Sequence, residues 1–263
     1  MLRVREIVRR VAHTDVPILL LGESGVGKEV MARYVHTQSG RESKPFIKVN
    51  CAALPADLVE SELFGHEQGA FTGALTSRAG KFEQAHTGTL LLHEIGEMTS
   101  HLQSKLLQVL QDGTLSPLGG RKTIQVDTRI IASTNVKIEE AVASGKFRED
   151  LYFRLNMIST DLPPLRERRE DIPGLCDYFI SLYRDRYNNG VQELSPELLE
   201  CFVRHDWPGN VRQLENFIKR FLVLPSVQTP FLSLDSPAFL RNLVHIPVPP
   251  YPRYPDNRER PLH

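Results

Sequence analysis

The chain has 263 residues, of which 41% are hydrophobic and 24% charged, as in ordinary water-soluble globular proteins. Basic and acidic residues number 32 each, so no net basic field indicates nucleic-acid binding. No apolar run approaches the roughly 20 residues that span a bilayer. The three cysteines form no CxxC or Cys/His pattern, so neither a disulfide framework nor a zinc site is indicated. We expect a cytoplasmic protein.

Five short apolar runs recur in the first two thirds of the chain, and most are continuous rather than alternating. Such runs are typical of strands buried on both faces of a parallel sheet. Helical patterns lie between them, as where Leu102, Leu106 and Leu110 form one apolar stripe with Val109. This alternation predicts an α/β fold, a parallel sheet flanked by helices, over residues 1–165. The runs are 17–21, 46–49, 89–92, 129–132 and 157–162.

The first predicted strand is followed by GESGVGKE and then by a helical pattern, which is the context of a phosphate-binding loop. Its glycines let backbone N–H groups face phosphate oxygens, the helix N-terminus favours an anion, and Lys28 reaches the outer phosphates. The alternative is a glycine-rich turn without a ligand. Glu29 occupies the position of the Ser or Thr that usually helps to hold Mg²⁺. The predicted ATP-binding residues here are Gly22, Glu23, Ser24, Gly25, Val26, Gly27, Lys28 and Glu29.

The pattern changes after Pro163 and Pro164, and residues 166–224 predict a small all-α lid. Ser195, with a proline and a glutamate after it, is typical of a helix N-cap. A turn at 207–210 precedes a last helix, for which one apolar face is predicted. Residues 225–263 contain nine of the 18 prolines and predict a Pro-rich, mostly irregular tail. The predicted face of the last helix comprises Val211, Leu214, Ile218 and Phe221.

Three motifs together resemble the sigma-54 interaction domain, an AAA+ ATPase, of bacterial enhancer-binding transcription activators. They are GESGVGKE at 22–29, ELFGHEQGAFTGA at 62–74 and WPGNVRQLEN at 207–216. The resemblance runs from about residue 4 to residue 222, and Glu29 is the family's own residue after the lysine. It implies a ring, expected to be a hexamer, that couples ATP hydrolysis to remodelling of sigma-54 RNA polymerase.

The GAFTGA segment is too rich in glycine to form a stable helix. Without the family, it would be interpreted as a surface turn with Phe71 tucked under the domain. The resemblance implies instead a mobile loop at the ring pore, in which Phe71 and Thr72 contact sigma-54. The predicted contact residues are Gly69, Ala70, Phe71, Thr72, Gly73 and Ala74.

Two asparagines at strand ends receive catalytic roles from the resemblance. Asn50 resembles a polar switch that holds the catalytic glutamate until the partner engages; the alternative is a strand-end cap. Asn135, with Thr134, resembles sensor I, which orients the attacking water; the alternative is a helix N-cap.

Three arginines receive roles in the same way. Arg148 and Arg154, in FREDLYFRL, resemble arginine fingers that reach a neighbouring subunit's ATP. The alternative is two solvated arginines on a helix with an apolar face of Phe147, Leu151 and Leu155. Arg212 in the lid resembles sensor II, which connects the γ-phosphate to the lid and is counted with the ATP-binding residues.

The strand GTLLLHE departs from the family pattern, because His93 replaces the first carboxylate of the usual Asp-Glu pair. Glu94, the expected general base, is present. Mg²⁺ prefers oxygen ligands, so His93, grouped with the ATP-binding residues, is a poor substitute. We therefore expect Mg²⁺ to be held mainly by the nucleotide and water, and no protein ligand is assigned to it.

Two functions follow from this departure: an active motor, or a nucleotide-binding sigma-54 interaction module in which His93 impairs hydrolysis. AAA+ machines that unfold proteins or load clamps are a third class, but they lack GAFTGA. Nothing in residues 225–263 predicts a recognition helix. Direct sequence-specific DNA binding is therefore not expected of this chain.

Overall fold

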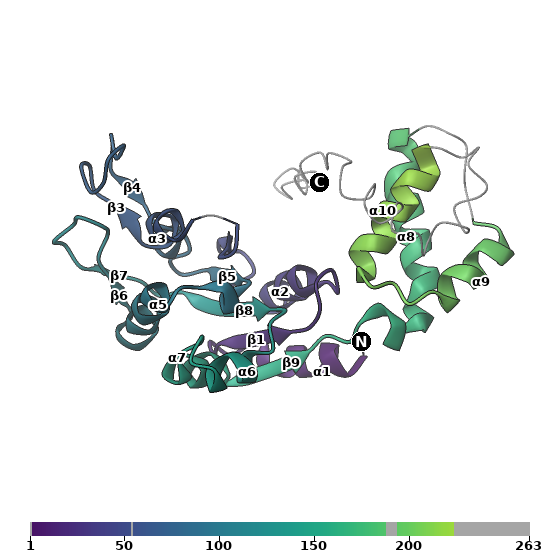
Figure 1. Cartoon of the computed structure of the whole chain (residues 1–263), viewed down its shortest axis with the longest axis horizontal. Helices are drawn as coiled ribbons and strands as arrows, with labels where there is room; N and C mark the ends of the chain where they lie inside the picture. Colours follow the sequence, from purple (N-terminus) through teal and green to yellow (C-terminus); the bar gives the residue numbers. More distant parts are fainter. Residues whose placement is uncertain (1, 54, 188–193, 224–263) are drawn as a thin grey trace, which may run out of the picture.

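The computed structural model describes residues 2–53, 55–187 and 194–223 (Figure 1). The irregular tail expected at 225–263 lies outside the described residues. Within the described residues, none of the helices is long and apolar enough to cross a membrane.

The centre of the fold is a five-stranded sheet in the order β2-β5-β8-β1-β9, and every neighbouring pair is parallel. The five apolar runs are these strands, with ends shifted by one or two residues, so the predicted α/β class is confirmed. The inner strands are almost wholly buried, whereas β2 and β9, at the edges, are only partly so. The strands are β1 Ile18–Leu21, β2 Phe46–Asn50, β5 Thr89–His93, β8 Arg129–Thr134 and β9 Ile158–Asp161.

The sheet separates two apolar cores because successive side chains of a strand point to opposite faces. On β5, Leu90 and Leu92 join the core that contains α3, α5 and α7, whereas Leu91 joins the core that contains α1 and α2. The helices are α1 Leu2–Val11, α2 Lys28–Thr37, α3 Ala56–Phe64, α4 Lys81–Gln84, α5 Ser100–Asp112, α6 Ile138–Ala143 and α7 Glu149–Leu155.

Two short hairpins project from one end of the sheet domain (Figure 1). One pairs β3 Gly65–His66 with β4 Arg78–Ala79, and the other pairs β6 Thr114–Leu115 with β7 Ile124–Gln125. A bridge between His66 and Leu118 joins them. The GAFTGA segment forms the tip of the first hairpin.

The lid is built from α8 Ile172–Tyr187, α9 Pro196–Arg204 and α10 Asn210–Val223, around its own core. Trp207 is fully buried there and donates its indole N–H to the carbonyl of Phe202 at 2.7 Å. Ser195 caps α9 as predicted, accepting from the N–H of Leu198.

The predicted apolar face of α10 is partly wrong. The buried apolar side chains are Leu214, Phe217, Ile218 and Leu222, and the predicted Val211 and Phe221 are partly buried against that core. The helical period of the apolar residues in α10 is as predicted, but the buried face is rotated around the helix. The contact with α8 selects which apolar residues turn inward.

Candidate nucleotide site

The loop between β1 and α2 has the backbone of a phosphate-binding loop. Gly22, Gly25 and Gly27 all have positive φ, at 136°, 79° and 104°, a backbone conformation that residues other than glycine rarely adopt. Lys28 is 4% exposed, and its Nζ donates to the carbonyls of Gly22 at 2.8 Å and Glu23 at 3.3 Å. This loop, with Lys28 at the N-terminus of α2, is the arrangement that binds phosphate groups in other proteins.

Glu94 lies opposite this lysine, just after β5. Its Oε1 is 3.5 Å from Lys28 Nζ, and its Oε2 accepts the backbone N–H of Asn135 at 2.9 Å. Burial lowers the pKa of Lys28, while the charge of Glu94 works in the opposite direction. Glu94 also has a φ of 59°, a left-handed conformation that costs a non-glycine residue about 1–3 kcal/mol and is concentrated at functional sites.

The two asparagines that were predicted to be catalytic make different contacts in the structure. Asn135 lies beside Glu94 through its backbone, and α6 begins only at Ile138 with Lys137 as its N-cap, so the cap alternative for Asn135 does not hold. Asn50 Oδ1 accepts the N–H of Ala52 at 3.1 Å, which is the strand-end cap alternative. In the part of the chain that the structure describes, Asn50 makes no hydrogen bond to Glu94.

His93 ends β5, in register with Asn50 on β2 and Ser133 on β8. Its Nδ1 is buried, lies 3.5 Å from Glu94 Oε1 and makes no hydrogen bond among the described residues. Burial lowers the pKa of this imidazole, and the charge of Glu94 works in the opposite direction.

The donor groups near the loop do not fit Mg²⁺. Glu29, after the lysine, is engaged by Lys48 and by Arg33, the latter at 3.1 Å. His93 offers nitrogen where Mg²⁺ takes oxygen. Among the described residues no group of three or more His, Cys, Asp and Glu is placed to hold a metal. A metal ion here would need phosphate and water ligands as well.

The lid contacts the phosphate-binding loop through polar side chains. Arg212 Nη1 donates to Ser24 Oγ at 3.0 Å, so the predicted lid arginine does reach the loop. Asn210 Nδ2 donates to Glu23 Oε2 at 3.0 Å and to the carbonyl of Ser24 at 3.1 Å. The approach is close, because a Cβ on Gly25 would lie 2.4 Å from the carbonyl oxygen of Gly209.

Two further arginines complete these contacts between the lid and the phosphate-binding loop, which we call the clasp. Neither arginine was identified from the sequence, nor was Asn210. Arg166 forms two hydrogen bonds to the Glu23 carboxylate, at 2.9 and 2.6 Å. Arg168 is 5% exposed and donates to the carbonyl of Val26 at 2.7 Å. The signal was the basic run LRERR directly after the sheet domain. Two of the predicted ATP-binding residues therefore have their side chains engaged elsewhere. The carboxylate of Glu23 faces the lid, and the side chain of Val26 is buried in the core that contains α1 and α2.

The clasp predicts a pH effect on stability. Hydrogen bonds from Arg166 and then Asn210 lower the pKa of Glu23 from 4.5 to about 2. Stability from this depressed folded-state pKa is present above pH 4.5 and is lost as the pH falls towards 2. Because the carboxylate is 42% exposed, the effect is at most about 1 kcal/mol. We expect the Glu23→Gln variant to lose less stability than the unmodified chain between pH 4.5 and 2.5, as measured by thermal melting. Equal losses, or the same effect from Glu97→Gln at an exposed position, would contradict this.

Arg148 and Arg154 lie on or next to α7, whose apolar face of Phe147, Leu151 and Leu155 is buried as expected. Arg148 pairs with Asp150, at 3.0 and 2.7 Å, and Arg154 donates twice to the carbonyl of Leu110, at 3.2 and 2.7 Å. Neither contacts the phosphate-binding loop of its own chain.

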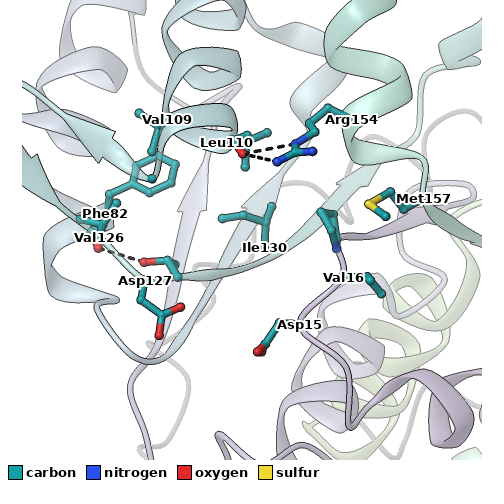
Figure 2. A pocket seen from close by; sticks show the side chains of 13 residues that line it. Asp15, Val16, Phe82, Val109, Leu110, Val126, Asp127, Ile130, Arg154 and Met157 are labelled. Carbon is teal, nitrogen blue, oxygen red and sulfur yellow. Dashed lines mark hydrogen bonds between the residues drawn. The ribbon is translucent and has the colours of Figure 1, made fainter.

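Figure 2 shows Arg154 in the wall of a pocket of about 470 Å³. The pocket is lined by residues that immediately precede β1, β8 and β9, among them Pro17, Thr128 and Met157. It therefore lies at the amino ends of the strands, whereas the phosphate-binding loop and Glu94 follow the carboxyl ends.

The GAFTGA segment is a compact, exposed turn. The N–H of Gly69 donates to the carbonyl of Ala74 at 2.9 Å, and Ala74 is buried. Phe71 is 39% exposed, with its ring edge-on to His66 at 5.1 Å, so it is not tucked under the domain. Thr72 is exposed beside it.

A phosphate-binding loop after the first strand of a parallel sheet, an acidic residue after β5 and a helical lid that reaches the loop define an AAA+ P-loop nucleotide-binding protein. Comparison with known families agrees: the sigma-54 interaction domain matches residues 1–161 and the AAA+ ATPase lid domain matches residues 166–235. The chain belongs to the sigma-54 interaction domain family.

Its relatives are transcription regulators. The chain is 54% identical over 222 residues to a Nif-specific regulatory protein of Sinorhizobium fredii, covering 84% of this chain and 37% of the relative. It is 48% identical to the phenol regulator MopR of Acinetobacter guillouiae, covering 89% and 42%. A crystal structure of NtrX from Brucella abortus superposes with a TM-score of 0.81 at 38% identity, covering 88% and 52%. The chain thus spans well under two thirds of the length of these relatives.

Proposed function

We propose that this chain is the ATPase core of a sigma-54-dependent transcription activator. In this proposal it binds ATP, assembles into a ring, expected to be a hexamer, and uses hydrolysis to remodel sigma-54 RNA polymerase in the cytoplasm. The observation that carries the proposal is the convergence of Lys28, Glu94 and Arg212 on one phosphate-binding loop. A structure of Brucella NtrX in complex with ATP, 38% identical with a TM-score of 0.80, supports the choice of nucleotide.

The residues divide the chemistry in the following way. Backbone N–H groups of the loop and Lys28 bind the phosphates. Glu94, oriented by the N–H of Asn135, accepts a proton from the attacking water. Asn135 is exposed, and its side chain is proposed to position the water. Arg212 senses the γ-phosphate through its place beside Ser24.

Asn50 is proposed to act as a switch between two partners. In the present conformation its amide oxygen caps Ala52, and Glu94 is held by other groups. Strand pairing places Asn50 directly beside His93, one residue from Glu94. A side-chain rotation could therefore exchange the cap for a contact with the carboxylate when sigma-54 engages the loop.

His93 favours a second candidate function, a nucleotide-binding module with impaired hydrolysis. The His93→Asp variant separates the two, because it restores the oxygen ligand. A large rise in turnover in the presence of Mg²⁺ would identify the histidine as the cause of impaired hydrolysis. Unchanged turnover would mean that the site manages without that ligand.

The sigma-54 contact is tested with Thr72→Ala. Because Thr72 is exposed on the loop and distant from the phosphate site in sequence, ATP turnover should stay within about twofold. Loss of a central contact costs about 2 kcal/mol, which corresponds to roughly 30-fold weaker binding to sigma-54 holoenzyme. The measurement is holoenzyme binding and promoter opening, with Thr76→Ala as the matched control. Normal promoter opening by Thr72→Ala would remove this role from the loop.

A further inference from the structure

The imidazole of His93 is an unused buried donor at the nucleotide site. Its Nδ1 is covered, makes no hydrogen bond among the described residues and lies 3.5 Å from Glu94 Oε1. A buried polar atom without a partner is costly, and such atoms in native structures often mark an ion or ligand site. His93 occupies the sequence position at which the family pattern has a carboxylate.

The surroundings of His93 hold it in place. Its backbone is paired on both sides, with Asn50 on β2 and with Ser133 on β8, and its carbonyl accepts the N–H of Cys51 at 2.9 Å. The charges of Lys28 and Glu94 act on the ring, so it lies within the electrostatic field of the phosphate-binding loop. The backbone of His93 is therefore fixed, and the groups that cover Nδ1 are what must move for the ring to ligate an ion.

The chemistry of this donor selects among metals. Imidazole nitrogen suits Mn²⁺ poorly, Co²⁺ and Ni²⁺ increasingly well, and Mg²⁺ hardly at all, following ligand softness and the order of divalent affinities. The protein offers few oxygen ligands here, since Glu29 is occupied by Lys48 and Arg33. Nucleotide phosphates and water would complete a six-coordinate shell.

We propose that His93 ligates the metal that accompanies the nucleotide and makes the site select a first-row transition dication, such as Co²⁺, over Mg²⁺. This inference rests on the proposed nucleotide binding and deepens it by naming the metal class. It separates this chain from relatives with a carboxylate at this position, which are expected to select Mg²⁺.

The first test is direct detection of the ligand. The unmodified chain is mixed with ADP and Cu²⁺, a paramagnetic first-row dication that imidazole binds well, and pulsed electron paramagnetic resonance is used to detect nuclei coupled to the metal. We expect phosphorus coupling from ADP together with nitrogen coupling from an imidazole. The nitrogen signal should disappear in His93→Asp and His93→Gln and persist in His13→Asp, which changes an exposed histidine. Phosphorus coupling without nitrogen coupling in the unmodified chain would overturn the proposal.

The second test is metal preference, measured as the affinity for ADP with Mg²⁺ or Co²⁺ at equal free concentration. We expect Co²⁺ to strengthen binding relative to Mg²⁺ at least about tenfold more in the unmodified chain than in His93→Asp. An equal ratio in both proteins would overturn the inference and leave the proposed nucleotide binding intact. Failure of the unmodified chain to bind ADP, with or without metal, would instead remove the proposed function and the inference with it.

Discussion

Replacing Glu94 with alanine is expected to lower ATP turnover by about 10²–10⁴-fold while leaving ATP affinity within a few-fold. The carboxylate is positioned by the N–H of Asn135 at 2.9 Å and by Lys28 at 3.5 Å. Glu94 also has a strained backbone conformation, of the kind that is concentrated at functional sites. Nucleotide affinity depends instead on the loop backbone and Lys28, which the change leaves in place. Steady-state phosphate release and equilibrium binding of a fluorescent ATP analogue measure the two effects separately.

The control is Glu97→Ala, which removes an exposed carboxylate three residues further along the chain. Both variants are assayed with Mg²⁺ and with Co²⁺, and again in the His93→Asp background, so that a low basal rate does not hide the effect. Turnover by Glu94→Ala equal to that of the control would show that another group activates the water.

Arg154→Ala is expected to lower turnover by about 10³–10⁵-fold, the range for an arginine supplied by a neighbouring subunit. Among the described residues, this guanidinium donates to the carbonyl of Leu110 in the wall of a pocket at the amino ends of the strands (Figure 2). A catalytic role therefore requires a second subunit. Arg148→Ala should have an effect of the same kind, whereas Arg186→Ala, at an exposed lid position, should have none.

Mixing two inactive variants tests that requirement directly. A subunit with Arg154→Ala keeps its own Glu94, and a subunit with Glu94→Ala keeps its own arginine. In a mixed ring some sites combine the intact Glu94 of one subunit with the intact Arg154 of its neighbour. Turnover should therefore reappear on mixing and rise with protein concentration. Two inactive proteins that stay inactive together, although they co-assemble, would contradict a role in trans.

Much of the fold could be predicted because its signals are local. Each inner strand is a continuous apolar run, since both faces of the sheet are covered, and the loop at 22–28 needs glycine wherever φ is positive. The phase of α10 and the capping of Ala52 by Asn50 were harder to predict. Both depend on which of several compatible contacts the neighbouring chain segments offer.

The sequence by itself determined the family, the parallel α/β class, the phosphate-binding loop and the replacement of the family's carboxylate by His93. These features depend only on residue type and short-range spacing. Only the tertiary structure decided the strand order, the contact of Asn135 with Glu94 and the clasp of Arg166 and Asn210 on Glu23. Those contacts join residues 41 to 187 positions apart. Their formation depends on how the sheet and the lid pack, and no local pattern records it.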